Sequence, residues 1–209
     1  MKTITILSQK GGAGKTTIAL SLAVSFERDG KQTIVMDIDP QASASKWFDQ
    51  RQDDTPYVIS IQAERLAETL ETAKSNGGDI AIIDTSPNAE NSALKACRVA
   101  DLVLIPCRPS IYDINAIGSS IDIAKYANKK AFVIVNAIFP NATKMFRELQ
   151  DTISEQYKIP VLEVYYSQRS AFVHSALEGK TAQEFEPNGK ASEEERLLYQ
   201  LVDQVLNEW

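Results

Sequence analysis

The chain has 209 residues, of which 44% are hydrophobic and 24% are charged. This length and composition predict one globular domain, spanning residues 1–209, with a sizeable core. There are 22 Lys and Arg against 28 Asp and Glu, so the net charge is −6. This charge excludes a protein that coats nucleic acid over its whole surface, although it allows a local basic patch.

The apolar segment near the start, residues 4–7, is too short for a signal peptide. No stretch approaches the ~20 apolar residues that cross a bilayer. Cys97 and Cys107 form no CxxC pair and have no His cluster beside them, which predicts free thiols in a reducing compartment. We therefore expect a cytoplasmic protein.

Short segments rich in Ile and Val alternate along the chain with longer segments of helical periodicity. The expected strands lack polar alternation, as parallel strands covered on both faces do; they are 4–8, 33–36, 79–83, 102–106 and 131–135, with weaker candidates at 57–61 and 161–165. The expected helices are 15–28, 63–74, 91–99, 114–126, 144–157 and 193–207. This order predicts an α/β fold with a doubly wound, mostly parallel sheet flanked by helices, in which ligands bind at the carboxyl ends of the strands.

The strongest motif is the sequence KGGAGKTT at residues 10–17, which follows an expected strand and opens an expected helix. This context is typical of a phosphate-binding loop. The helix N-terminus and a glycine-rich backbone present N–H groups to phosphate oxygens, here from Gly11, Gly12, Ala13 and Gly14. Lys15 is expected to contact the β and γ phosphates, Thr16 to bind Mg²⁺, and Thr17 to lie near the α phosphate.

Two acidic segments follow other expected strands. Asp37 and Asp39 come after the strand at 33–36, and Pro40 indicates that this strand ends there. They are interpreted either as site residues or as acids that cap a helix or turn. Asp84 ends the apolar segment IAII, which is the Walker B arrangement, with a carboxylate that faces Mg²⁺.

The usual phosphate loop has a glycine where Gln9 stands, and this chain has an additional lysine at Lys10. The resulting KGGxGK[ST] pattern, with the DxDPQ and Walker B segments in order, resembles the deviant Walker A ATPases of the ParA/MinD family. The resemblance covers nearly the whole chain and is strongest for short ParA-type plasmid partition ATPases. It implies a P-loop NTPase fold with ATP and Mg²⁺ as ligands.

The resemblance also implies roles for single residues. Lys10 would reach across a sandwich homodimer to the partner's ATP and act with Lys15 in catalysis. Asp37 would lie near the Mg²⁺ shell with Thr16 and Asp84, and Asp39 would orient the attacking water.

Later positions complete the predicted site. Pro106 ends the expected strand at 102–106 and Pro109 follows it, which predicts a rigid extended turn. The matching family segment implies that Pro106 contacts the nucleotide. Asn136 ends an expected strand, and its amide is interpreted either as a reader of the adenine edge or as a turn residue. By resemblance, Arg169 and Lys190 contact DNA without sequence specificity, the alternative being solvated surface cations.

The function implied by the resemblance is a slow ATPase whose ATP-bound dimer binds nucleoid DNA. A centromere-binding, ParB/ParG-like adaptor protein would stimulate hydrolysis and so drive plasmid segregation. One alternative is that the same machinery positions a protein cargo. A MinD-like membrane ATPase is a further alternative, which the acidic tail at 193–209 disfavours because anionic lipid repels it; a membrane partner is therefore not expected.

Overall fold

Seven parallel strands form one sheet in the order β3-β2-β4-β1-β5-β6-β7 in the computed structural model, which describes residues 1–208. The predicted domain and its acidic tail reach Trp209, which lies outside the described residues. The strands are β1 Lys2–Ile6, β2 Thr33–Asp37, β3 Tyr57–Ser60, β4 Ile80–Asp84, β5 Leu102–Cys107, β6 Ala131–Ile138 and β7 Val161–Ser167. The predicted parallel α/β sheet is thus confirmed, and each expected strand is present within a few residues of its expected bounds.

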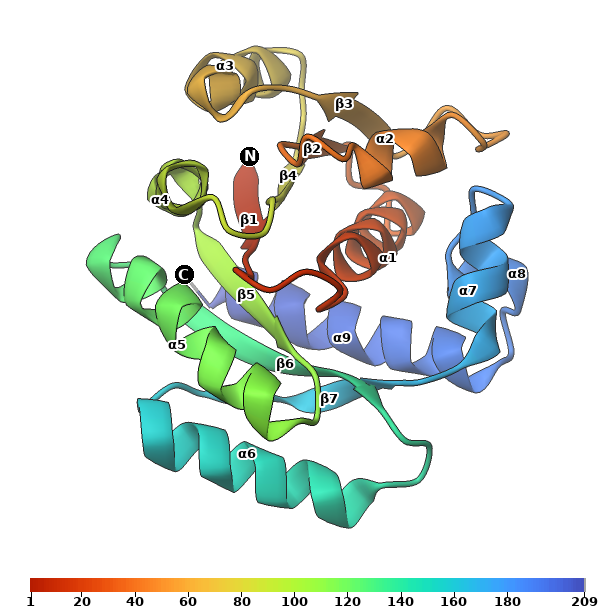
Figure 1. Ribbon diagram of the computed structural model, residues 1–209. Coiled ribbons are helices and arrows are strands. Elements are labelled where there is room, and N and C mark those ends of the chain that lie inside the picture. The colour runs from red at the N-terminus through yellow and green to blue at the C-terminus, as the bar shows by residue number, and fades with distance from the viewer. Residues whose placement is uncertain (209) are drawn as a thin grey trace.

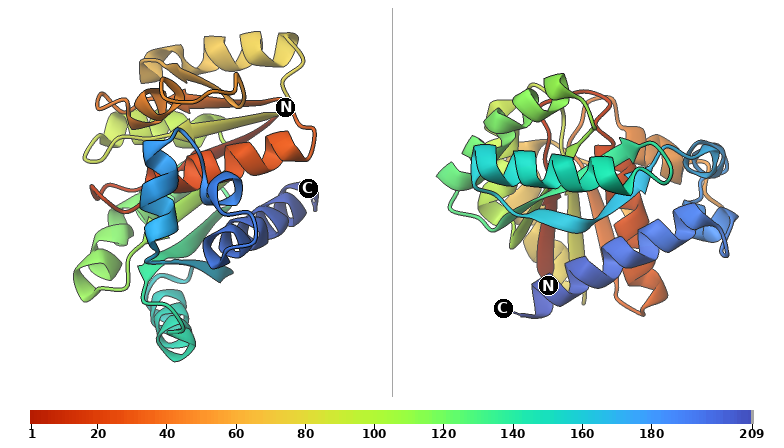
Figure 2. Two further views of the ribbon diagram at one scale, coloured as in Figure 1. Left: turned by 90° about the vertical axis from the view of Figure 1, so that its right-hand side faces the viewer. Right: turned by 90° about the horizontal axis from the view of Figure 1, so that it is seen from below.

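Helices cover both faces of the sheet (Figure 1). They are α1 Lys15–Arg28, α2 Ser43–Phe48, α3 Leu66–Ser75, α4 Glu90–Val99, α5 Ile111–Tyr126, α6 Thr143–Tyr157, α7 Ser170–Leu177, α8 Ala182–Phe185 and α9 Lys190–Asn207, with a 3₁₀ turn at Ala63–Arg65 before α3. α1 and α9 pack together on one face, and α4, α5 and α6 cover the other (Figures 1 and 2). The longer helices match their predicted positions to within a few residues, whereas the sequence does not predict α2, α7 and α8, because each is too short to show a clear period.

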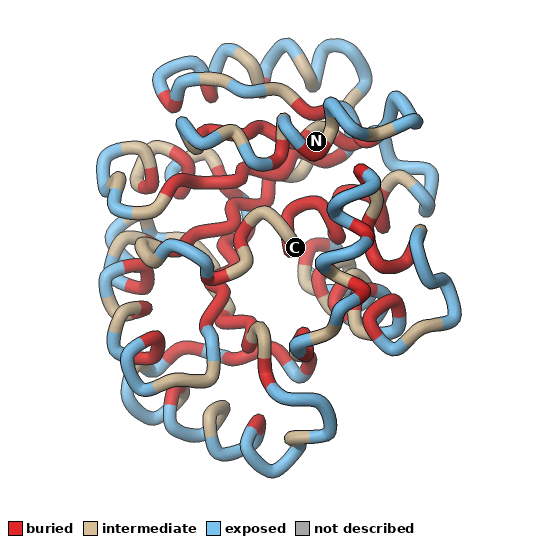
Figure 3. Tube along the Cα trace, turned by 45° about the vertical axis from the view of Figure 1, so that its right-hand side comes forward, coloured by how far each residue is buried: buried red, intermediate tan, exposed pale blue. Residues whose placement is uncertain are grey.

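The buried residues follow the central strands, and the exposed residues lie on the outer sides of the helices and in the loops (Figure 3). One core cluster joins α1 and α9 to the sheet, and it includes Phe26, Leu198 and Val202. The apolar face of α9 is therefore part of the core. Within residues 1–208, no helix has the length and apolar character that a bilayer crossing needs.

Strand β5 corrects one expectation about the prolines. It continues to Cys107, so Pro106 is buried within the strand opposite Ile134 and does not begin a turn. β1 pairs with β5 only as far as Leu104. Beyond Leu104 the strand has a neighbour on one side only, a position where the missing N–H of proline is tolerated.

Candidate functional site

The loop between β1 and α1 adopts the backbone shape that its glycines permit. Gly12 and Gly14 have φ angles of 72° and 96°, which side chains with a Cβ rarely adopt. Gly14 immediately precedes α1, so the free N–H groups of the first helical turn face the same loop. The arrangement is that of an anion site at a helix N-terminus.

The side chains around this loop form a compact group of opposite charges. The Thr16 hydroxyl donates to Oδ2 of Asp84 at 2.6 Å, and both Lys15 and Asp84 are buried. Burial raises the pKa of Asp84 to about 7, even though the Thr16 hydrogen bond and the Lys15 charge act in the opposite direction. Burial likewise lowers the pKa of Lys15, an effect that Asp84 and Asp39 partly offset. The site therefore holds buried charges that a bound phosphate and cation would compensate.

One atom of this group indicates where a cation fits. Oδ1 of Asp84 is buried and has no hydrogen-bond partner in the described structure. Carboxylate and hydroxyl oxygens are ligands that Mg²⁺ accepts, and Mg²⁺ often takes only one or two protein ligands beside phosphate and water. Residues 1–208 contain no group of three or more His, Cys, Asp or Glu placed to hold a metal. The free Asp84 oxygen and the Thr16 hydroxyl fit a Mg²⁺ site that phosphate and water oxygens would complete.

Asp37 and Asp39 occupy different environments at the end of β2. Asp37 is fully buried, and its carboxylate accepts the N–H groups of Asp39 at 3.0 Å, Ala44 at 3.0 Å and Ser45 at 3.2 Å. Burial outweighs these hydrogen bonds and raises the pKa of Asp37. Asp37 thus fixes the N-terminus of α2, the alternative left open by its sequence, and its place near Mg²⁺ stays a prediction. Asp39 is half-buried, and its role toward water also stays a prediction.

Lys10 lies on the rim of the loop and is paired within its own chain. Its Nζ is 2.9 Å from Oδ2 of Asp113, and Arg108 Nε is 3.5 Å from the other carboxylate oxygen. Burial would raise the pKa of Asp113, but the Ser110 hydroxyl, Lys10 and Arg108 outweigh it and hold this pKa below its usual range. Asp113 received no role from the sequence; the signal that could have found it is the Ser110-x-x-Asp113 spacing at the start of α5.

Asn136 contacts the loop directly. Its Nδ2 donates to the Ala13 carbonyl oxygen at 2.7 Å, and a Cβ on Gly14 would lie 1.9 Å from the same nitrogen. The side chain therefore fastens β6 to the phosphate loop. Contact of Asn136 or of Pro106 with adenine stays a prediction.

The two predicted DNA contacts also have partners within the chain. Arg169 binds Glu194, with Nη2 and Nε at 2.8 and 2.9 Å from Oε1, and Glu194 also accepts N–H and O–H from Ser167. Lys190 is exposed and pairs with Glu193 at 2.8 Å. Arg169 thus joins the end of β7 to α9, and DNA contact by either residue stays a prediction.

The cysteines behave as the sequence predicts. Cys97 and Cys107 are both buried free thiols, and burial raises the pKa of each to about 12. His174 lies exposed on α7 with its ring 6.3 Å from that of Phe185. Burial and the raised pKa values make both cysteines unreactive thiols of the core.

Residues 4–182 match the family described as the CobQ/CobB/MinD/ParA nucleotide binding domain. The chain belongs to this family. Its fold is that of the ParA/MinD P-loop NTPases: MinD from Pyrococcus horikoshii OT3, solved with Mg-ADP, superposes with a TM-score of 0.80 over 98% of this chain and 97% of that chain, at 19% identity. The ParA/MinD fold explains why the loop, Thr16 and Asp84 meet at one edge of the sheet.

The names of two relatives state a biological role. The Halothiobacillus neapolitanus protein named "Maintenance of carboxysome distribution protein A" is 27% identical over 99% of this chain and 95% of its own length. The "Chromosome partitioning protein ParA" of Myxococcus xanthus is 25% identical over 77% of this chain and 73% of its own length. The ParA/MinD family therefore includes proteins named for distributing a protein assembly as well as proteins named for partitioning DNA.

Proposed function

We propose that this chain is a ParA-like ATPase that positions a cargo. The observation that carries the ATPase part is the loop geometry: Gly14 in its positive-φ conformation, buried Lys15, and the 2.6 Å contact from Thr16 to Asp84. These groups suit phosphoryl transfer, which depends on positioning and on charge stabilisation. Bound Mg²⁺ would neutralise developing charge on the phosphates.

Within this proposal the catalytic residues are Lys15, Asp39 and Lys10. Lys15 offers an ammonium to the phosphates, and Asp39 orients water from the end of β2. In the ATP-dependent homodimer, Lys10 leaves Asp113 and binds the γ phosphate held by the second copy. Lys10 thus takes the role of the deviant Walker A lysine. The ion pair between Lys10 and Asp113 must break for that dimer to close.

The nature of the cargo follows from the relatives. Positioning of a protein assembly, the alternative left open by the sequence, has more support than plasmid partition, because the carboxysome distribution protein matches over 99% of this chain. The pairing of Arg169 and Lys190 with glutamates gives no independent support for a DNA surface at those residues. We propose that an adaptor protein on the cargo stimulates hydrolysis.

Membrane binding has less support from the geometry. A membrane-anchoring helix needs an accessible apolar face, and in α9 the residues Leu198, Val202 and Leu206 are buried in the core. The proposal therefore contains no membrane step.

The test measures oligomeric state and DNA retention with ATP, with ADP and without nucleotide. Light scattering should show a dimer only when ATP·Mg²⁺ is present, and not with ADP or without nucleotide. The Lys10→Ala variant should remain monomeric while it still binds ATP. A protein that stays monomeric with ATP contradicts the dimer. Retention on DNA with ATP alone supports a nucleoid track for the cargo, and retention that is the same in all three states contradicts it.

A further inference from the structure

Helix α2 is attached at its start to the predicted nucleotide segment. The Asp37 carboxylate, which ends β2 beside the site, accepts N–H groups from Ala44 and Ser45 in the first turn of α2. Asp37 is fully buried, so its side chain is packed on all sides. A shift of the segment from Asp37 to Asp39 is therefore expected to move the start of α2.

Just beyond the other end of α2, Arg51 is held by Glu184 of α8 and by Gly179 in the turn between α7 and α8. Its Nη1 and Nη2 donate to the two carboxylate oxygens of Glu184 at 3.0 and 2.6 Å, and Nη1 also donates to the Gly179 carbonyl at 2.9 Å. The Arg51 side chain is only 5% exposed. A bidentate pair with so little solvent holds its two elements in a fixed orientation.

Backbone and indole contacts reinforce this attachment. The Trp47 indole N–H donates to the Lys180 carbonyl at 3.0 Å, and the Arg51 guanidinium lies 4.9 Å from the centre of the indole ring. Gly179 has a φ of 64°, and a Cβ there would lie 2.5 Å from the Arg51 nitrogen. The two segments thus meet backbone to backbone, which only glycine permits.

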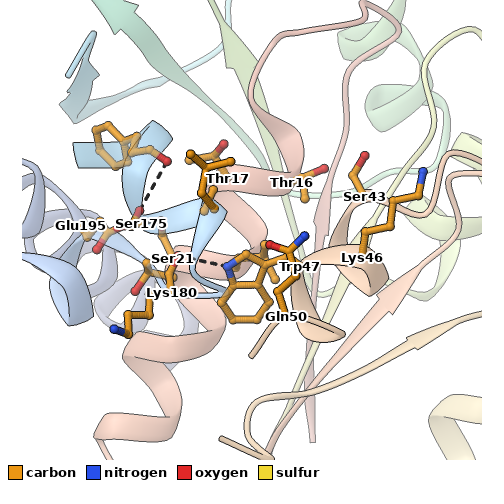
Figure 4. Close-up of a pocket in the computed structure, with 15 residues that line it drawn as sticks. Thr16, Thr17, Ser21, Ser43, Lys46, Trp47, Gln50, Ser175, Lys180 and Glu195 are labelled. Atoms are coloured by element: carbon orange, nitrogen blue, oxygen red, sulfur yellow. Dashed lines mark hydrogen bonds between the residues drawn. The ribbon is translucent and has the colours of Figure 1, made fainter. Parts of the chain in front are cut away.

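α2 and α7 form two walls of one cleft of about 310 Å³, and the start of α1 forms a third (Figure 4). Thr16 and Thr17 of the phosphate loop line this cleft together with Phe172 and Ala176 of α7. A change in the distance between α2 and α7 therefore reshapes a space that begins at the predicted nucleotide site.

We propose that α2 is a lever that carries the state of the Asp37–Asp39 segment to α7, and that Arg51 is the positioning residue that fastens this lever to the α7–α8 turn. The inference rests on the proposed nucleotide site, because ATP·Mg²⁺ is what changes the Asp37–Asp39 segment. Movement of the lever displaces α7 with its two exposed large hydrophobic residues, Val173 and Leu177.

Two signals report on the lever in the full chain. Trp47 emission reports its contacts and is recorded in a Trp209→Phe background, where Trp47 is the remaining tryptophan. Hydrogen exchange of residues 170–185 reports on α7 and α8. Affinity for ATP is measured in the same samples with a fluorescent ATP analogue.

In the wild type, ATP·Mg²⁺ should change Trp47 emission and slow exchange across 170–185 by about tenfold. In Arg51→Lys, which keeps the charge but loses the bidentate geometry, the analogue should still bind while the slowing falls below about twofold. The Glu184→Gln variant should also bind the analogue and lose most of the slowing, because glutamine keeps the capping interaction with Thr181 but lacks the charge. Arg65→Lys is the matched control on an exposed ion pair and should respond as the wild type does.

Hydrogen-exchange measurements without nucleotide, the nucleotide-free arm of the experiment, distinguish this inference from the proposed function. Asp37→Asn should speed exchange across 170–185, and the same change should add nothing further in an Arg51→Lys background. If the analogue binds but exchange in 170–185 is unchanged, or if the effects of Asp37→Asn and Arg51→Lys are additive, the lever is refuted. If the analogue does not bind, the proposed ATPase fails, and the nucleotide-free arm still decides the lever.

Discussion

Lys10 Nζ lies 2.9 Å from Oδ2 of Asp113, and the acid is buried whereas the lysine side chain is 33% exposed. The lysine proposed to serve a second copy is therefore held in its own chain. Asp113→Asn should release it, so that ATP-dependent dimers form at about two- to fivefold lower ATP concentration, the equivalent of a pair worth about 0.5–1 kcal/mol. Light scattering across an ATP titration measures this shift; an unchanged or raised midpoint would contradict the exchange of partners.

Lys15→Ala should weaken ATP binding at least about tenfold, because a hydrogen bond between charged groups contributes about 1.5–3 kcal/mol. Calorimetric titration with ATP·Mg²⁺ measures the loss. Lys144→Ala removes an exposed lysine on α6 and should leave the affinity unchanged. Equal affinity in the wild type and Lys15→Ala would refute the assignment of the site.

Gly14→Ala should destabilise the loop for two separable reasons, a φ of 96° and overlap with Asn136. We expect a loss of about 2–4 kcal/mol in the free energy of unfolding. Combining it with Asn136→Ala removes the overlap but keeps the backbone strain, so the double variant should recover about 1 kcal/mol relative to the sum of the single changes. Urea unfolding tests this, and strictly additive losses would show that the close approach of Asn136 is unimportant.

Glu195 predicts a pH dependence of stability. Its carboxylate is buried on α9 and accepts hydrogen bonds from Ser21, Ala182 and Gln183; burial nevertheless raises its pKa from 4.5 to about 7. A raised pKa means that the folded state binds the proton more tightly, so this contribution is complete below pH 4.5 and is lost as the pH rises through 7.

The measurement compares unfolding of the wild type and Glu195→Gln between pH 5 and 8. The wild type should lose stability more steeply, by at most about 1.4 kcal/mol per pH unit. Asp84 titrates in the same range, so only the difference between the two proteins isolates Glu195. Parallel curves would show that Glu195 does not titrate in this window.

Arg169 and Lys190 should separate in their effects. Arg169→Ala removes a half-buried partner of Glu194 and should cost about 1–3 kcal/mol of stability. Lys190→Ala removes an exposed pair and should leave the stability almost unchanged. Urea unfolding measures both. Retention on DNA at several salt concentrations tests the predicted contact: a shallower salt slope without loss of stability would make Arg169 a DNA residue.

The long elements were predictable because their signals are local. The sequence predicts α1 from Lys15 to Arg28, the bounds that the structure has, because a regular apolar face and Gly30 define it. The sequence does not predict α2, α7 or α8, because six, eight and four residues carry too little periodic pattern. The prediction of a turn at Pro106 is wrong because the sequence does not reveal that β1 has already ended beside it.

The sequence by itself determined the family features: the strand, the glycine-rich loop, Lys15 and Thr16 are contiguous, and their chemistry depends on neighbours along the chain. Only the tertiary structure decided which charged side chains are paired within the chain. Asp113 holds Lys10, Glu194 holds Arg169, and Arg51 finds Glu184 at a separation of 133 positions. Such pairs form where folding brings distant segments together and removes water. In that environment the free-energy cost of leaving a charge unpaired exceeds the entropy cost of fixing two side chains in one pair.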